Sequence, residues 1–130
     1  MGKSGNEERD FVERQLPRLS VPVDLPLKVE VVDSDETPWP ARCLNIHLAG
    51  ILLEFTTDKI PLLAIDSKVL ITIQFNREIA VKIPAIVRHS VAGQLGLYFP
   101  DLATHAPEKE DQLSRIIRTV EREILRRKNL

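Results

Sequence analysis

Apolar and polar residues alternate along most of the chain between residues 19 and 99. In segment 19–32 every second residue from Val21 to Val31 is apolar, which predicts a strand with one buried face. Pro22 and Pro26 lie within this segment. Because proline has no amide hydrogen to donate to a ladder, the segment should lie at a sheet edge or only just enter the sheet.

Five further strand segments follow, separated by short turns. They are predicted at residues 41–47, 50–55, 68–75, 79–90 and 95–99. Only Leu48 and Ala49 separate the first two of these segments, which therefore meet at a tight corner. Pro84 marks a bulge or an edge within the fourth. About six strands in meander order predict an all-β fold, a closed or nearly closed antiparallel barrel.

After the last strand the period of the pattern changes to that of a helix. Pro107 suits the first helical position, and the acidic residues that follow it favour a helix N-terminus. Apolar residues recur at steps of three and four from Leu113 to Ile124, which predicts a C-terminal helix at about 107–128 with an apolar stripe. This stripe needs a partner surface, which is either the barrel or a second copy of the chain in a homodimer.

Composition limits the classes of function. A length of 130 residues suggests one domain; the polar first 13 residues predict a flexible N-terminal arm, and residues 14–130 form the single domain. The net charge of −1 disfavours DNA as a partner. One cysteine, Cys43, suggests a reduced cytoplasmic compartment. Because no segment approaches the roughly twenty apolar residues of a membrane span, we expect no membrane insertion.

The residues that commonly carry catalysis or hold metals show no recognisable arrangement. His47, His89 and His105 have no spacing to one another or to Cys43 that resembles a zinc site. Neither a glycine-rich phosphate loop nor a serine elbow is present. The sequence therefore predicts a binding module and not an enzyme, without a metal or a cofactor.

One cluster of arginines follows a single side of the predicted helix. Two interpretations are open for it. It is a solvated face partly neutralised by Asp111 and Glu123, each four residues ahead of an arginine, or it is a docking face for an acidic partner or nucleic acid. The near-neutral total charge favours the solvated face. The arginines are Arg115, Arg118, Arg122 and Arg126.

A second cluster consists of Arg14 and Arg18, four residues apart and directly ahead of the first strand. Another polar segment lies at the tight corner, where Asn45 is followed by His47 and then by Gly50. With these two motifs in this order and strands between them, the chain resembles the PilZ domain family from about Arg14 to the helix. The resemblance includes a last strand at residues 95–99.

The PilZ resemblance implies a six-stranded antiparallel β-barrel with a C-terminal helix. It also implies a ligand, the bacterial second messenger cyclic di-GMP. Arg14 and Arg18 would grip guanine edges and phosphate, because arginine forks bind both. Asn45 would meet a guanine edge, and Gly50 would allow close approach of backbone and ligand. Ordering of the N-terminal arm over the nucleotide would signal to a separate, unidentified effector protein, in a process such as motility or biofilm regulation.

One position departs from the family pattern, because His47 stands where the family has serine. Imidazole is larger than a hydroxyl group and titrates near neutral pH. His47 could stack on a base, reach a phosphate when protonated, or block the pocket. The alternative function is therefore a divergent PilZ-like interaction adaptor that does not bind the nucleotide.

Overall fold

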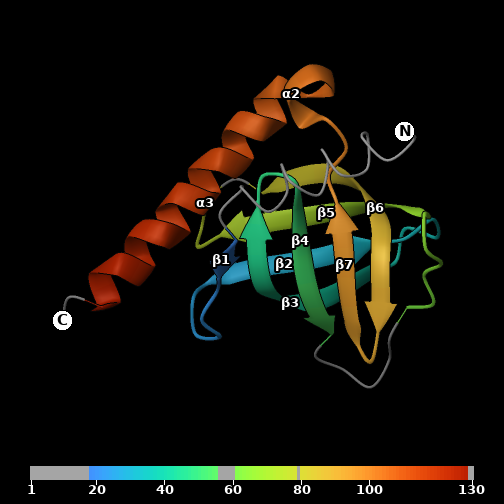
Figure 1. Ribbon diagram of the computed structural model, residues 1–130, viewed down its shortest axis with the longest axis horizontal. Coiled ribbons are helices and arrows are strands. Elements are labelled where there is room, and N and C mark those ends of the chain that lie inside the picture. The colour runs from blue at the N-terminus through green and yellow to red at the C-terminus, as the bar shows by residue number, and fades with distance from the viewer. Residues whose placement is uncertain (1–17, 56–60, 79, 129–130) are drawn as a thin grey trace, which may run out of the picture.

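The structure is a computed structural model that describes residues 18–55, 61–78 and 80–128. Arg14 and the expected arm at residues 1–13 lie outside this described part. The elements, shown in Figure 1, are β1 (Leu19–Ser20), β2 (Leu27–Val32), β3 (Pro38–His47), β4 (Gly50–Phe55), β5 (Lys68–Phe75), β6 (Val81–Val91), β7 (Gln94–Tyr98), α2 (Leu102–His105) and α3 (Pro107–Lys128). The short helix α2 has no counterpart among the predicted elements.

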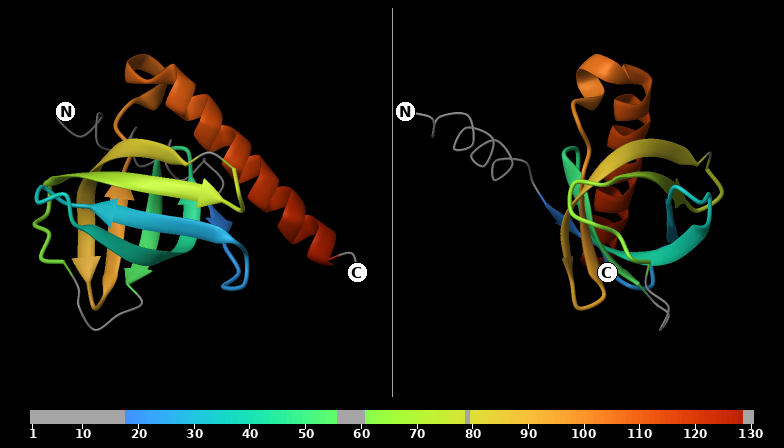
Figure 2. Two further views of the ribbon diagram at one scale, coloured as in Figure 1. Left: turned by 180° about the vertical axis from the view of Figure 1, so that it is seen from behind. Right: turned by 90° about the vertical axis from the view of Figure 1, so that its right-hand side faces the viewer.

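Strands β2 to β7 close into a barrel. Every pairing is antiparallel, the strand order is β3-β2-β5-β6-β7-β4, and β4 pairs back onto β3 to complete the ring. The barrel is visible almost end-on in the right-hand view of Figure 2. The predicted six-stranded antiparallel barrel with a C-terminal helix is thus confirmed, with the short β1 added beside β3. The predicted meander order is wrong, because β5 pairs with β2 and β4 pairs with β7.

The first predicted strand, 19–32, is wrong as one continuous strand. β1 and β2 pair with the same side of β3 but at different places, Ser20 opposite Asn45 and Val29 opposite Ala41. Pro22 lies in the loop between them, where its carbonyl accepts the amide of Leu25 at 3.2 Å. The apolar alternation continued through this loop because Leu25 is buried there as it would be in a strand. The alternation of apolar residues in the sequence therefore did not reveal that the strand is interrupted.

Pro84 lies at a place in β6 where no ladder bond is lost. Val87 donates its amide to Ser67 of the β5 side at 3.0 Å, so alternate residues of β6 face β5 and the ring nitrogen of Pro84 points away from it. The pairing of β6 with β7 starts only at Ile86. Pro84 therefore occupies a local edge, one of the two alternatives predicted for it.

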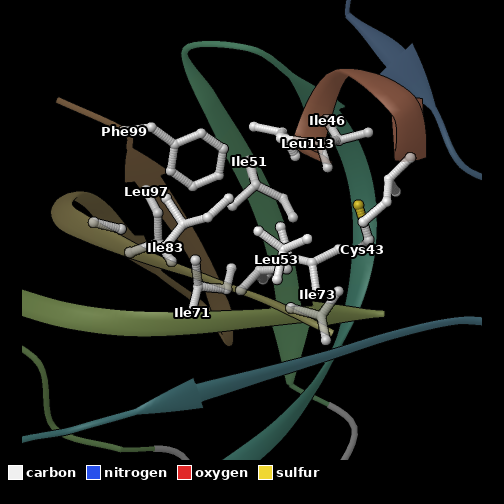
Figure 3. Packing of buried hydrophobic residues seen from close by; sticks show 14 of the residues in the cluster. Cys43, Ile46, Ile51, Leu53, Ile71, Ile73, Ile83, Leu97, Phe99 and Leu113 are labelled. Atoms are coloured by element: carbon white, nitrogen blue, oxygen red, sulfur yellow. The ribbon is translucent and has the colours of Figure 1, made fainter. Parts of the chain in front are cut away.

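The core fills the barrel and extends under α3. Figure 3 shows inward side chains from β3 to β7 packed together with Leu113 of α3. Leu113, Ile116 and Val120 are buried against the barrel, and burial of such side chains contributes roughly 1.5–3 kcal/mol each. The apolar stripe of the helix is thus covered by the chain's own barrel. None of the described helices is long and apolar enough to cross a membrane.

Candidate functional site

A hollow of about 380 Å³ lies on the outer face of the barrel, where β3, β4, β7 and β6 are neighbours. Figure 1 shows β4, β7 and β6 side by side on this face. Four of the predicted site residues line the hollow, namely Arg18, Asn45, His47 and Gly50. Arg14, the fifth, lies outside the described residues. We call this hollow the outer-face site.

A β-bulge in β3 turns two polar side chains toward the outer-face site. The register with β4 shifts between Cys43 and Asn45, and the core-facing residues on either side of the shift are Cys43 and Ile46. In an unbroken strand, Asn45 and His47 would follow Cys43 into the core, because alternate residues share a face. The extra residue reverses this alternation, so both side chains face outward.

A second bulge in β6 acts from the other side of the outer-face site. The register with β7 shifts between Val87, which is buried, and His89, which is exposed. Arg88 and His89 are therefore both directed outward, although they are consecutive. Both line the hollow. Neither residue was predicted to bind a ligand; two consecutive polar residues at the end of an alternating strand were the available signal.

Arg18 is brought to the outer-face site by the two residues of β1. Leu19 pairs with Ile46 and Ser20 pairs with Asn45. The amide of Val21 then donates to the carbonyl of Leu44 at 3.0 Å. These contacts fix the backbone that follows Arg18 beside the bulge of β3, so the second arginine of the motif lies with the corner residues.

The surroundings of His47 favour its neutral form. The side chain is 9% exposed, and its Nδ1 atom accepts the backbone N–H of Ala49 at 3.2 Å. Burial, and secondly the positive charge of Arg18, lower the pKa of His47 below its usual value. Because Nδ1 is an acceptor, the ring proton lies on Nε2, and His47 presents a neutral N–H donor.

Gly50 is required by the barrel itself. A Cβ atom at this position would clash with the carbonyl oxygen of Leu97 on β7, and it would lie 3.6 Å from Nε2 of His47. Gly50 pairs with Tyr98, and the neighbouring Ala49 carbonyl accepts the amide of Phe99 at 2.8 Å. The close approach that glycine makes possible therefore occurs between the backbones of β4 and β7, and not only between backbone and ligand as expected.

An arginine and an aromatic ring form the rim opposite Arg18. The guanidinium carbon of Arg88 lies 5.1 Å from the centre of the Tyr98 ring, a distance typical of a cation–π contact. Arg88 also forms an ion pair with Asp66 at 3.4 Å. The sequence could not pair Arg88 with Tyr98, because their proximity depends on the register that sets Ile86 opposite Tyr98.

The outer-face site combines groups that suit a flat, anionic ligand. Arg18 and Arg88 supply positive charge and forked donors, and Tyr98 supplies a ring surface. Asn45 offers an amide with both donors and an acceptor, and His47 offers one donor. Within the described part of the chain, no three side chains of the metal-binding kinds lie together.

A model of a protein family described as PilZ domain matches residues 12–119. The match spans both arginines of the N-terminal motif, the corner segment, all the strands and much of α3. No curated protein matched the sequence.

Solved structures with the same fold include three bacterial proteins. The PilZ domain of YcgR from Escherichia coli, with c-di-GMP, is 21% identical with a TM-score of 0.74, covering 89% of this chain and 97% of that one. The K. pneumonia MrkH–c-di-GMP complex is 13% identical with a TM-score of 0.69, covering 88% and 55%. The Bacillus subtilis inhibitor of motility MotI is 18% identical with a TM-score of 0.54, covering 82% and 50%. This chain thus spans about half of MrkH and of MotI.

Proposed function

The chain belongs to the PilZ domain family, and on that premise we propose that it is a receptor that binds cyclic di-GMP at the outer-face site. The YcgR and MrkH structures that share its fold are described as holding this nucleotide. At these levels of identity the likeness concerns the fold alone. The proposal for this chain therefore depends on its own residues.

The observation that carries the proposal is the meeting of two motifs at one hollow. Arg18 comes from the N-terminal motif, whereas Asn45 and His47 come from the corner segment. The segments are separated in sequence by β2 and most of β3, and the pairing of β1 with β3 brings them together. An arrangement that unites both family motifs on one face supports a shared ligand.

Each group has a task that matches part of the nucleotide. Arg18, together with Arg14, donates forked hydrogen bonds to guanine O6 and N7 or to phosphate oxygens. Asn45 binds a guanine edge through its amide. Arg88, held over Tyr98, adds positive charge for the phosphates and a flat surface for a base.

His47 takes over the donor role of the family's serine. With Nδ1 occupied by the amide of Ala49, the ring donates from Nε2 to an acceptor on the nucleotide. Because the neutral form is favoured, the ring contributes a hydrogen bond and no charge. This assignment selects one role for a residue that could also stack, carry charge or block.

We propose further that binding orders the N-terminal arm, residues 1–13, over the nucleotide. In sequence, Arg14 directly follows this arm and Arg18 directly precedes β1, so a nucleotide bound by both arginines tethers the arm to the barrel. A segment that is pinned only when ligand is bound changes the surface presented to an effector protein.

Isothermal titration with cyclic di-GMP tests the receptor function. We expect heat of binding at nucleotide concentrations on the order of tens of micromolar or below. Replacement of Arg14 by alanine should weaken binding by about tenfold or more, since it removes a charge-assisted fork. A folded wild-type chain that gives no heat contradicts the proposal.

The second candidate function is an interaction adaptor that does not bind the nucleotide. Its supporting observation is that the His47 ring, only 9% exposed, lies packed at the position of the family's small serine. The variant His47→Ser separates the two functions. A gain of binding in this variant from none in the wild-type chain would show that the histidine blocks the pocket, and the adaptor would then be the function of the natural chain.

A further inference from the structure

A second, larger hollow of about 620 Å³ lies between α3 and the β5–β6 hairpin. Figure 2 shows α3 passing beside the end of β5, and the two elements are in contact. Its apolar lining comes from Phe75, Val81 and Ile116. Its helix side carries Arg115, Arg118 and Arg122. We call this hollow the arginine groove.

The positive charges of the arginine groove are not neutralised by neighbours within the described residues. All three arginines are exposed, and none forms an ion pair with any part of the chain that the structure describes. Arg118 has one hydrogen bond, from Nε to the carbonyl of its own helix at Ser114, 3.4 Å away. Among the groove residues the single carboxylate is Glu78.

The end of the same helix shows the opposite arrangement. Arg126 forms an ion pair with Glu123 at 2.6 Å, and Arg127 contacts Glu123 at 3.8 Å and Asp24 at 2.7 Å. The arginine stripe therefore divides into a neutralised end and an uncompensated middle. A solvated face with neutralised charges therefore describes the end of the helix. It does not describe the middle, where the arginines border a hollow with an apolar floor.

We propose that the arginine groove docks an acidic segment of a partner protein that carries a bulky apolar side chain. The arginines attract its carboxylates, and the floor made by Phe75, Val81 and Ile116 receives the apolar side chain. Exposed charge pairs are individually weak, so the apolar anchor is a necessary part of the proposal.

Charge distribution favours an acidic peptide over a nucleic acid. The chain has a net charge of −1, so it offers no overall attraction to a long polyanion, whereas the groove attracts a few carboxylates locally. The groove shares no residue with the outer-face site. The proposal therefore stands whether or not cyclic di-GMP binds.

Fluorescence polarisation tests the docking directly. The probe is a short fluorescein-labelled peptide of glutamates around one phenylalanine, and its control is the same peptide with lysines in place of the glutamates. The wild-type chain should bind the acidic probe and not the basic one. The double variant Arg115→Glu/Arg118→Glu should weaken binding by about tenfold or more, because attraction becomes repulsion.

The matched control is the double variant Lys28→Glu/Lys68→Glu. It changes the net charge by the same amount with exposed residues that do not line the groove, and its affinity should stay within about twofold of the wild type. Melting curves establish that each variant is folded. If the groove variant unfolds, Arg115→Gln/Arg118→Gln replaces it, with a smaller expected loss.

Four results would overturn the proposal. The wild-type chain could fail to bind the acidic probe, or the Lys28→Glu/Lys68→Glu control variant could lose as much affinity for the probe as the groove variant. Single-stranded DNA could displace the probe at equal concentration, which would make the groove a nucleic-acid surface. Sedimentation could show a dimer that the groove variant converts to monomer, which would make a second copy of the chain the occupant.

Discussion

The outer-face site and the arginine groove both place arginines beside aromatic or apolar groups, but they are assembled in different ways. The outer-face site draws its residues from Arg18, directly ahead of β1, and from four barrel strands, and bulges in two of these strands set the direction of their side chains. The arginine groove takes all its arginines from one helix at regular spacing. Arg88 is held by Tyr98 and Asp66, whereas the groove arginines have no ion pair in the described part of the chain.

This difference indicates two kinds of recognition. A site whose donors are fixed by the barrel backbone is suited to one small ligand of defined shape, because little order remains to be imposed on binding. A groove lined by long, exposed side chains adapts to a peptide and depends on the sum of its charges. The outer-face site should therefore be sensitive to single changes, and the groove only to several.

The largest effect is expected where the outer-face site and the barrel use the same atoms. Gly50→Ala places a Cβ atom against the Leu97 carbonyl, and should lower the free energy of unfolding by roughly 2–4 kcal/mol. Gly96→Ala is the graded comparison, because its Cβ would lie 2.9 Å from the Cβ of His89, a less severe overlap than the one with the Leu97 carbonyl oxygen at position 50. Urea denaturation measures both. Equal stability of Gly50→Ala and wild type would contradict the close approach of β4 and β7.

The next effect separates the two regions by ligand. Arg18→Ala should weaken binding of cyclic di-GMP by about tenfold or more, because a charge-assisted fork is lost. Arg115→Glu/Arg118→Glu should leave this affinity within about twofold of wild type, because the arginine groove is separate from the outer-face site. Isothermal titration of both variants provides the comparison. A loss in the groove variant as large as that in Arg18→Ala would show that the two regions are coupled.

A smaller loss is expected for the arginine that sequence analysis missed. Arg88→Ala should weaken cyclic di-GMP binding by roughly fivefold, since one positive charge and its stacking surface disappear. Stability should change by less than about 0.5 kcal/mol, because the ion pair with Asp66 is exposed. Asp66→Asn is the control, because it removes the charge of the ion-pair partner while asparagine tolerates the positive φ of 71° at this position. Unchanged affinity in Arg88→Ala would exclude Arg88 from the ligand contacts.

The buried histidine makes stability depend on pH. The folded chain lowers the pKa of His47 below the ordinary 6.5, so between the two values the unfolded chain binds more protons and stability rises with pH. On acidification, stability should start to fall near pH 6.5 and level off below the folded pKa. His47→Gln should remove this component in denaturation series at several pH values, whereas His105→Gln, at an exposed position, should keep it. A His47→Gln profile that matches wild type would contradict the assignment.

The smallest effect concerns the contact between α3 and the loop that follows β1. Arg127 donates to Asp24 at 2.7 Å, and this hydrogen bond is the main cause that lowers the pKa of Asp24. Its stabilising contribution is present above pH 3.8 and is lost as the pH falls through the folded pKa. Asp24→Asn should slightly lower the melting temperature at neutral pH but not in strong acid. An equal decrease at both pH values would show that the ion pair is not its cause.

The strands and the helix could be predicted from the sequence because their patterns are local. Period-two alternation identified β5 at residues 68–75, and the step of three and four identified α3. The two motifs around Arg18 and Asn45 were enough to indicate the family from the sequence alone. Local patterns failed at residues 21–26, where Leu25 is buried in a loop and so keeps the alternation of a strand.

The composition of the outer-face site was only partly predictable. Arg18, Asn45, His47 and Gly50 could be named because they belong to sequence motifs. Arg88 and Tyr98 could not be assigned from sequence, because their contact depends on the pairing of β6 with β7. The protonation state of His47 also could not be predicted from the sequence. Its pKa depends on burial and on Arg18, which is distant from His47 in sequence.

Periodicity and motif spacing are properties of the chain, so they were enough to predict the barrel, the helix and four of the residues that line the outer-face site. The direction of the side chains and their state of charge depended on the tertiary structure. Two bulges reverse the alternation of β3 and β6, and one extra residue is enough to move a side chain from core to surface. Which charges on α3 remain uncompensated likewise depended on which residues pack against this helix.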